Sequence, residues 1–375
     1  MSWENTTLGE VIRLRRGHDL PAQSRIHGDI PIVSSSGITG YHNVSKVSGP
    51  GVVTGRYGTL GEIHYVEGPY WPLNTALYVE DFKGNHPRFV AYLLSTLGLG
   101  ERNAAGAVPG INRNALHPLP VCIPSVDEQE RIADFLVRYD KLIEINQRRI
   151  SLLEECAKML YCEWFVSLRF PGYESAPSVD GIPQGWGRKP ISGMVEINPK
   201  TAFDKEHIYP FVPMQALSEN SMVIEGIEER IISGGAKFQN NDTLLARITP
   251  CLENGKTGFV QFLDEDKPVA SGSTEFIVMR SATVSPYWVY CTARDEGFRE
   301  HAIGSMVGSD GRQRVNPKCF DTYFAFQPPQ SVLSDFDERV GPMFKEVQVL
   351  VSMNRSLREA RDALLPKLMA GEIQV

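Results

Sequence analysis

The clearest hydrophobic pattern in the chain is a heptad seam that begins at Ile132. Positions spaced alternately four and three residues apart carry Ile132, Leu136, Tyr139, Ile143, Asn146, Ile150, Leu153, Ala157, Leu160 and Trp164. Nine of these ten are apolar or aromatic, and a seam of this length predicts a long helix that packs against another helix. We place this helix at residues 127–164, with Asp127 as its N-cap because Glu130 follows three residues later.

The same pattern returns 204 residues later and predicts a second helix within residues 331–375. Its seam consists of Phe336, Val340, Met343, Val347, Leu350, Asn354, Leu357, Arg361, Leu364 and Leu368. The simplest way to bury both seams within one chain is to pair the helices antiparallel; the alternative is that each helix packs on its own domain. Asn146 and Asn354 are candidates for polar residues that set the register, or for solvated positions at a helix kink.

The rest of the chain favours short strands. In the first part, β-branched and aromatic runs separated by Gly, Pro and Asn lie at residues 30–33, 51–58, 62–66 and 75–79, with a predicted helix at 88–97. In the second part, similar runs lie at residues 211–214, 242–248, 257–263 and 274–279, with a predicted helix at 286–300. A Pro-, Gly- and Ser-rich segment at residues 165–185 reads as a linker.

The two parts are an internal repeat. Trp3 and Leu8 correspond to Trp186 and Ile191 at an offset of 183 residues, whereas Ile111-Asn112 corresponds to Val315-Asn316 at an offset of 204. The difference of 21 residues is extra length in the second copy. We therefore predict an α+β fold with a pseudo-two-fold repeat, in which two long antiparallel coiled-coil helices separate two β-rich α/β domains. The predicted divisions are residues 1–126, 127–164, 165–185, 186–330 and 331–375.

Composition restricts the function. The net charge of −7 argues at first against nucleic acid, but residues 1–125 carry +1 while residues 186–330 carry −3. The six cysteines form no CxxC pair, and the sequence predicts neither a signal peptide nor a membrane span, so we expect a reducing, cytoplasmic setting.

Three common catalytic motifs are incomplete or absent in the sequence. Gly255-Lys256-Thr257 resembles the end of a P-loop, but Pro250 stands where the first glycine is required. Asn198-Pro199-Lys200 lacks the second proline and the aromatic residue of an adenine-methyltransferase motif, and the histidines show no HExxH spacing. The sequence therefore predicts a binding protein with no catalytic residue, no metal site and no cofactor of its own.

Four stretches together resemble the specificity subunit of type I restriction-modification systems. They are LPVCIPSVDEQERIADFL (119–136), EWFVSLRFPGYE (163–174), IPQGW (182–186) and RDALLPKLMAGEI (361–373). The resemblance implies target-recognition domains at residues 1–126 and 186–330, each reading half of a split site in double-stranded DNA. It also implies two modification (methyltransferase) subunits as partners, which use S-adenosylmethionine to methylate adenine, and restriction subunits that need ATP and Mg. Glu128-Gln129 becomes Val332-Leu333 in the second copy, so partner-docking surfaces based on this motif would differ.

Loops that could present hydrogen-bond donors to DNA occur at matching places in the two copies. In the first copy the candidates for DNA contact are Ser34, Ser35, Ser36, Arg56, Tyr57, Thr59, Asn112 and Arg113. In the second copy they are Arg247, Asn254, Lys256, Ser271, Ser273, Arg312 and Arg314. The alternative for each is a surface turn whose small residues serve the backbone. Two other functions fit the same sequence: a coiled-coil protein–protein scaffold without DNA specificity, and an enzyme without a recognisable motif.

Overall fold

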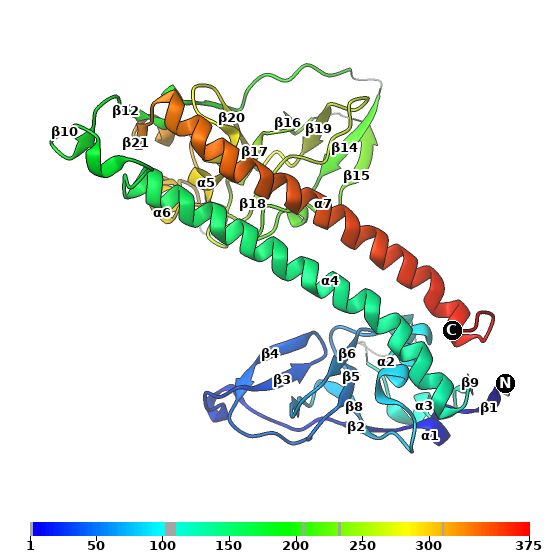
Figure 1. Ribbon diagram of the computed structural model, residues 1–375. Coiled ribbons are helices and arrows are strands. Elements are labelled where there is room, and N and C mark those ends of the chain that lie inside the picture. The colour runs from blue at the N-terminus through cyan, green and yellow to red at the C-terminus, as the bar shows by residue number, and fades with distance from the viewer. Residues whose placement is uncertain (1–2, 102–109, 205–206, 232–233, 310) are drawn as a thin grey trace. The chain divides into compact units, whose positions relative to one another are not determined.

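The computed structural model describes residues 3–101, 110–204, 207–231, 234–309 and 311–375, and Figure 1 shows its ribbon. The contacts divide the chain into two compact units. Unit 1 comprises residues 1–144 and 355–375, and unit 2 comprises residues 145–354. The long helices α4 (Val126–Tyr161) and α7 (Gln330–Met369) both run through this division, so each unit contains one segment of either helix.

Unit 1 is built on two sheets and a short closing ribbon. The main sheet has antiparallel strands in the order β2 (Arg13–Arg16), β8 (Ala76–Asp81), β5 (Gly51–Gly55) and β6 (Ile63–Val66). The second sheet has the order β4 (Gly37–His42), β3 (Ile30–Ser34) and β7 (Trp71–Pro72), and β3 runs parallel to β7. The ribbon pairs β1 (Glu4–Thr7) with β9 (Pro120–Ile123), and the helices are α1 (Leu8–Val11), α2 (Pro87–Thr96) and α3 (Arg113–Leu116).

Unit 2 repeats this plan. Its main sheet has the order β13 (Val195–Ile197), β20 (Phe276–Ser281), β17 (Thr243–Ala246) and β18 (Thr257–Phe259). The second sheet has the order β15 (Glu228–Ile231), β14 (Ile208–Val212), β19 (Val269–Gly272) and β16 (Ala236–Gln239), with β14 parallel to β19. The closing ribbon pairs β12 (Gly187–Pro190) with β21 (Phe324–Gln327), and the helices are α5 (Pro286–Arg294) and α6 (Glu296–Gly304).

Strand order therefore confirms the internal repeat. The order β2-β8-β5-β6 corresponds to β13-β20-β17-β18, and in each second sheet one parallel strand pair is preserved. The side chain of Asn112 accepts a hydrogen bond from the backbone of Asn114 at the start of α3. Asn316 does the same for Lys318 at the start of the 3-10 helix Pro317–Asp321. Strand β16 and helix α6 are additions to unit 2 within the described residues, and both lie in the part of the second copy that the sequence predicted to be longer.

Local capping changes two helix boundaries that periodicity predicted. The single helix expected at residues 286–300 is two helices, because Asp295 has an extended backbone and its carboxylate caps α6 at the backbone of Phe298. The long helix begins at Val126 rather than at Asp127: the carbonyl of Ser125 accepts the first helical hydrogen bonds, so Asp127 lies inside the first turn.

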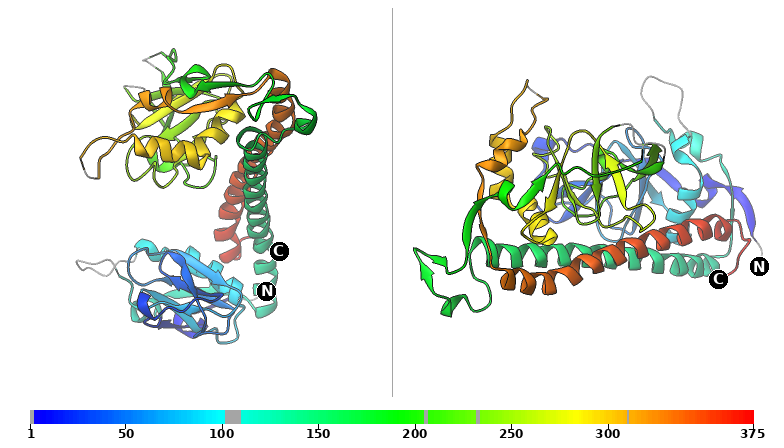
Figure 2. Two further views of the ribbon diagram at one scale, coloured as in Figure 1. Left: turned by 90° about the vertical axis from the view of Figure 1, so that its left-hand side faces the viewer. Right: turned by 90° about the horizontal axis from the view of Figure 1, so that it is seen from above.

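The segment that the sequence predicted to be a linker is packed. Helix α4 ends at Tyr161 and continues as a π-helical turn, Cys162–Val166. The β10–β11 hairpin, Ser178–Val179 with Ile182–Pro183, follows it, and Figure 2 shows this hairpin beyond the end of α4. The buried ring of Phe170 lies 5.2 Å from that of Trp186, so burial of aromatic side chains fixes a segment whose composition suggests a flexible connection.

The heptad seam is covered along its whole length. Each of its twelve aliphatic seam residues is buried or half-buried: Ile132, Leu136, Ile143, Ile150, Leu153, Leu160, Val340, Val347, Leu350, Leu357, Leu364 and Leu368. In unit 1 the beginning of α4 and the end of α7 share a core with α2, and in unit 2 the end of α4 and the beginning of α7 share a core with α5. Helix pairing and packing on a globular domain therefore occur together.

Polar pairs along the seam establish that the two helices run antiparallel. In unit 2 the Asn146 Nδ2 donates to Asn354 Oδ1 at 2.9 Å, and these side chains are only 4% and 3% exposed. Also in unit 2, Arg149 forms an ion pair with Glu346 at 2.6 Å. In unit 1, Arg361 pairs with Asp140 at 2.7 Å, which explains a charged residue at a seam position. The two asparagines occupy the core position expected of residues that set a register.

The Glu128-Gln129 motif is an internal anchor, not a docking surface. The Gln129 side chain, 1% exposed, accepts from the backbone N–H of His86 at 2.9 Å and donates to the side chain of Asn85 and to the Pro124 carbonyl. Glu128 is also buried and pairs with Arg131. These bonds fasten the beginning of α4 to the beginning of α2. In the second copy Leu333 takes the place of Gln129 and lies in the core of unit 2, so an apolar contact replaces the polar one.

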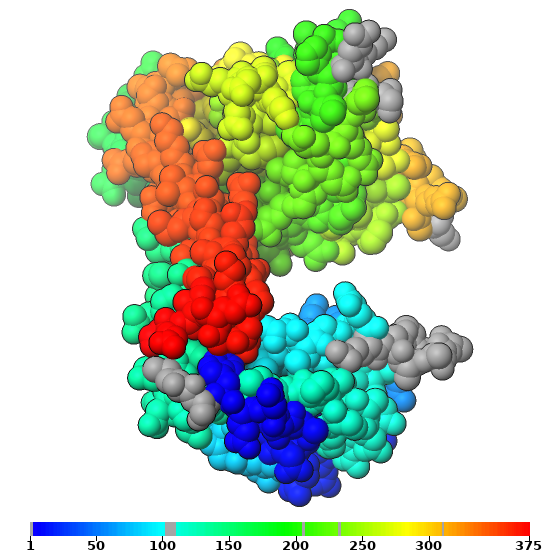
Figure 3. Space-filling view, turned by 90° about the vertical axis from the view of Figure 1, so that its right-hand side faces the viewer, coloured from blue at the N-terminus to red at the C-terminus, as the bar shows by residue number. Residues whose placement is uncertain are grey.

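The two ends of the chain also meet within unit 1. A Cβ added to Gly371 would lie 2.7 Å from the indole of Trp3, and Figure 3 shows the C-terminal residues against the N-terminal segment. Gly371 has a φ of +72°, a conformation that suits glycine. The C-terminal turn therefore packs closely on the first strand region and completes the unit.

We predict that Gln129→Ala destabilises unit 1. The substitution leaves the His86 N–H buried without an acceptor, which costs about 1–3 kcal/mol in the free energy of unfolding. Urea denaturation of the full chain measures the loss, and hydrogen exchange locates it at the beginning of α2. The exposed Gln147→Ala on the same helix is the matched control and should change stability by less than about 0.5 kcal/mol. Equal stability of the two variants would contradict the anchoring role.

Candidate nucleic-acid interface

The three predicted loops of unit 1 lie side by side. Tyr57 forms a β-bridge with Gly110, and the N–H of Ile111 donates to the carbonyl of Arg56 at 2.9 Å. A Cβ added to Gly58, which has a φ of +83°, would lie 3.3 Å from Ser35 Oγ. Segments about 20 and 55 residues apart in the sequence thus form one continuous surface of loops, supported by the main sheet.

The serine turn is largely occupied with its own geometry. Ser34 Oγ accepts from the N–H of Ser36 and donates to the carbonyl of Gly37, each at 3.2 Å, and so closes the β3–β4 turn. Ser34 and Ser35 are buried, which leaves the exposed Ser36 as the serine accessible to a ligand. For Ser34 the structure therefore supports the interpretation as a turn residue.

Arg56 and Tyr57 form a partly exposed platform. The Arg56 guanidinium lies 4.4 Å from the centre of the Tyr57 ring and donates to the carbonyl of Asn74 at 3.4 Å. Stacking on an aromatic face holds the guanidinium plane while its edge keeps free donors. Thr59 is half-buried behind this platform, and its carbonyl contacts Gly55 so closely that a side chain there would collide with it.

At the third loop the two candidates differ in role. Asn112 caps α3, as described above, so its side-chain oxygen is already engaged. Arg113 in the first turn of α3 is exposed. Residues 106–109 of the same predicted loop lie outside the described residues.

Unit 2 repeats the junction between loops with different side chains. The N–H of Val315 donates to the carbonyl of Arg247 at 2.8 Å, the counterpart of the bond from Ile111 to Arg56. The N–H of Thr249 donates to the carbonyl of Gln313 at 3.0 Å, so the segment after β17 and the segment before Val315 form a pair. Residue 310, within the second of these segments, lies outside the described residues.

The arginines of this junction are not equivalent. Arg314 forms a two-bond ion pair with Glu275, at 2.7 and 2.9 Å, and this hydrogen bonding holds the pKa of the Glu275 carboxyl below its usual range. Arg247 donates to the carbonyl of Val315 at 3.2 Å. Arg312 is exposed at the surface. Arg312 is thus the accessible cation, whereas Arg314 supports the loop.

The remaining candidates of unit 2 have structural partners. Asn254 donates to Glu219 at 3.0 Å, Lys256 donates to the carbonyl of Met214 at 3.3 Å, and Ser273 Oγ accepts from the backbone of Glu275. Ser271 is only 1% exposed because it lies on the central strand β19. A run of small polar residues is compatible with a surface turn and with a buried strand. The sequence analysis therefore predicted Ser271 at the surface, whereas the structure buries it in the sheet.

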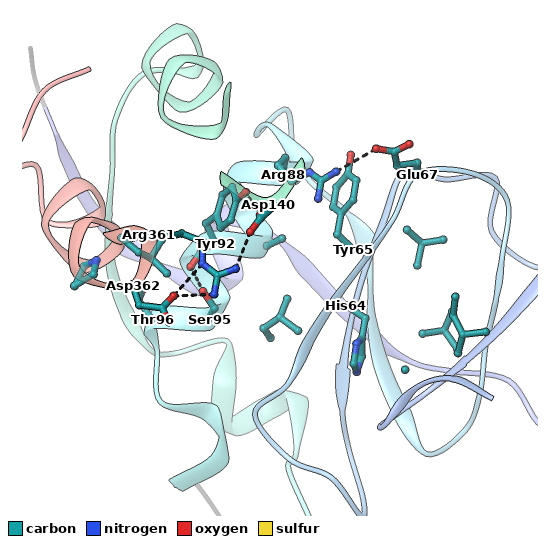
Figure 4. Close-up of a pocket in the computed structure, with 18 residues that line it drawn as sticks. His64, Tyr65, Glu67, Arg88, Tyr92, Ser95, Thr96, Asp140, Arg361 and Asp362 are labelled. Atoms are coloured by element: carbon teal, nitrogen blue, oxygen red, sulfur yellow. Dashed lines mark hydrogen bonds and ion pairs between the residues drawn. The ribbon is translucent and has the colours of Figure 1, made fainter. Parts of the chain in front are cut away.

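Sequence reasoning missed a cavity of about 1020 Å³ in unit 1, which is lined by apolar and polar side chains and shown in Figure 4. On one side the Arg88 guanidinium lies 3.5 Å from the Tyr65 ring. On the other, the Tyr92 hydroxyl donates to Asp140, which also accepts from Arg361. Burial raises the pKa of Tyr92, and the hydrogen bond to Asp140 raises it further. The charged residue Arg361 at a heptad position was the available signal for this network.

Among the residues that the structure describes, no group of three or more His, Cys, Asp or Glu side chains is placed to hold a metal ion. None of the helices in the described part of the chain combines the length and apolar character needed to cross a membrane.

Known proteins resemble both the sequence and the fold. Residues 1–155 match the family model of the type I restriction modification DNA specificity domain. The MjaIX specificity subunit of Methanocaldococcus jannaschii is 24% identical over 307 residues, which cover 76% of this chain and 69% of that protein. The EcoEI specificity subunit of Escherichia coli is 30% identical over 160 residues, 40% of this chain and 26% of that protein. A crystal structure of the type I S subunit from M. genitalium has a TM-score of 0.61 at 13% identity, covering 98% of this chain and 96% of that one.

These findings define the class of fold. The chain shares its duplicated α+β architecture with paired long helices with the M. genitalium S subunit. The comparisons confirm the resemblance of the chain to the specificity subunits of type I restriction-modification systems, most directly over residues 1–155.

We predict that Arg314→Gln raises the pKa of the Glu275 carboxyl toward its ordinary value, because the strongest hydrogen bond to the carboxylate is removed. In the wild-type protein the ion pair persists above the lowered pKa and is lost as the pH falls through it. NMR titration of carbon-labelled glutamate in the full chain measures both. The nearby Arg312→Gln is the control and should leave this pKa unchanged; the same shift in both variants would contradict the assignment.

Proposed function

We propose that the chain reads a split site in double-stranded DNA, with residues 1–126 and 186–330 as its two target-recognition domains. The observation that carries the proposal is the duplicated junction between loops, at Arg56 with Ile111 and at Arg247 with Val315. One backbone arrangement thus presents a loop surface in each copy, and different side chains occupy the two surfaces. Loops on a rigid sheet are the usual place for binding residues.

The two readers have different chemistry. The first offers the stacked Arg56–Tyr57 platform with Arg113 beside it, and the second offers Arg312 on a loop supported by an ion pair. Arginine recognises guanine edges or phosphates through paired donors, so both surfaces suit DNA. Because the side chains differ, we expect two different half-sites and a recognition sequence that is not a palindrome.

The outer faces of the long helices support a docking surface for partner subunits. On α4, Ile145, Leu152 and Met159 follow one another at seven-residue spacing and are all exposed, at 54%, 42% and 54%. Val349 and Met353 on α7 are exposed as well. A regular apolar stripe on the outside of a helix pair is typical of a surface that another protein covers. We call these five side chains the outer stripe.

We infer that two modification subunits dock on these helices. Those subunits would bind S-adenosylmethionine and methylate adenine, and restriction subunits using ATP and Mg would join the same complex. The chain itself would contribute no catalytic group and no cofactor site. We also propose that the complex is cytoplasmic, as the sequence leads us to expect.

We predict that exchanging residues 186–330 for the corresponding domain of a different specificity subunit changes one half of the methylated sequence and leaves the other half unchanged. Methylated adenines are mapped in DNA from cells that express the chain with its modification partner. An exchange of residues 1–126 is the reciprocal control and should change the other half. A methylated motif that is not split, or one that neither exchange alters, would favour a protein scaffold over a DNA reader.

We predict that Ile145→Lys with Leu152→Lys weakens binding of the modification subunit by about 100-fold. Full burial of an aliphatic side chain contributes about 1.5–3 kcal/mol, and about half of each of these two side chains remains to be buried. Both side chains are exposed, so the chain should fold normally. Gln147→Lys with Ser151→Lys adds the same charge at exposed polar positions of α4 and is the matched control. Calorimetry or gel filtration of the complex measures the effect. Equal loss in both double variants would show that charge, not the outer stripe, is responsible.

A further inference from the structure

We propose that unit 2 holds a binding pocket for a backbone phosphate of DNA, formed by Lys200, Lys237 and Arg247. The proposal rests on the DNA-reading function above. It concerns residues that lie mostly outside the DNA-contact loops predicted from the sequence. The pocket is a cavity of about 610 Å³ between the two sheets of the unit. Its lining includes the hydroxyl side chains Thr201 and Thr274 and no aspartate or glutamate among the described residues.

The three cations reach the pocket from different elements. Lys200 follows β13, Lys237 lies on β16, and Arg247 directly follows β17. Strands of both sheets therefore place positive charge on one cavity, which no single segment of the sequence reveals. Thr274 follows β19 and brings a hydroxyl donor to the same cavity.

The positive charge of the pocket is not neutralised from within. Lys200 is exposed and makes no hydrogen bond or ion pair with any residue that the structure describes. Lys237 lies 4.3 Å from the Phe203 ring and 3.5 Å from the Gly235 carbonyl, contacts that orient an ammonium group without cancelling its charge. The Nε of Arg247 is buried without a hydrogen-bond acceptor among the described residues, so this donor is available to a ligand.

The carboxylates near the pocket are committed to other partners. Asp242 pairs with Arg280 at 2.6 Å, and Arg280 also donates to Thr201 Oγ1 at 3.1 Å. Glu275 is held by Arg314 at 2.7 Å and also interacts electrostatically with Arg247. In a domain of net charge −3, three cations facing a cavity without a carboxylate mark a site for an external anion. A concave site focuses the field of its charges and strengthens attraction for that anion.

Position decides in favour of a DNA phosphate. Arg247 belongs to the loop pair that matches the first reader, and Thr274 ends the small-polar run that begins on β19. The pocket therefore adjoins the surface on which we place the second half-site. Most protein–DNA hydrogen bonds go to phosphates and fix the position of the protein on the duplex without reading sequence. Free inorganic phosphate offers the same chemistry, and the experiment separates the two.

The test uses the full chain in complex with its modification subunits and a duplex that contains the mapped site. Lys200→Gln with Lys237→Gln should weaken binding about ten-fold at about 0.1 M salt and reduce the slope of log affinity against log salt by about 1. The preferred sequence should stay the same, because a phosphate contact carries no base information. Lys200→Arg with Lys237→Arg keeps the charge and should restore affinity and slope.

The exposed Lys189→Gln on β12 of the same unit is the matched control and should leave the slope unchanged. An unchanged slope in the double glutamine variant, with wild-type binding intact, overturns the phosphate pocket and leaves the proposed function standing. A changed sequence preference also overturns it, since the lysines would then read bases. Saturable binding of inorganic phosphate by the wild-type protein, combined with an unchanged DNA slope, assigns the pocket to free phosphate instead. If the wild-type complex fails to bind its DNA, the proposed function fails and this inference fails with it.

Discussion

The fold depends on burial of the heptad seam by two helices that lie far apart in the sequence. Leu368, near the C-terminus, is fully buried in the same core as Leu136 and Phe89, so unit 1 cannot be completed until the last helix is in place. Unit 2 is closed in the corresponding way by Ile150 and Val340. Each unit therefore contains one helix segment from the first copy of the repeat and one from the second. Each unit keeps its own sheets, and segments of both long helices complete its core.

Duplication preserved the backbone and changed the chemistry of its surfaces. The hydrogen bonds that join the loops recur at Arg56 and Arg247, and the capping role of Asn112 recurs at Asn316. These contacts use main-chain groups and one short side chain, so they place few demands on neighbouring residues. The anchor at Gln129, by contrast, became an apolar contact at Leu333. A repeated scaffold held by backbone bonds lets its exposed side chains diverge, as the proposed reading of two different half-sites requires.

The sequence predicts the long helices, the repeat and most strands, because each produces a periodic pattern or a set of turn residues within a short window. It cannot predict contacts that depend on chain folding. Asp140 is off the seam, and neither its pairing with Arg361 nor the hydrogen bond from Tyr92 follows from spacing. Ser271 was misplaced because local composition does not record which strand is central. The phosphate pocket draws on Lys200 and on residues some forty positions away in two sheets, so it becomes visible only in three dimensions.

Charge limits how such a subunit can use DNA. The chain carries −7 overall, so long-range attraction to a duplex is absent unless cations gather locally. Several of its arginines are already committed: Arg13 and Arg15 both pair with Glu80, and Arg314 pairs with Glu275. Pairing orders these side chains but reduces the counterion release that gives non-specific affinity. Under the proposed function, this arrangement favours discrimination between sequences over tight binding by the chain alone. Most of the affinity for DNA would then come from the proposed partner subunits, and the chain would set the position at which they act.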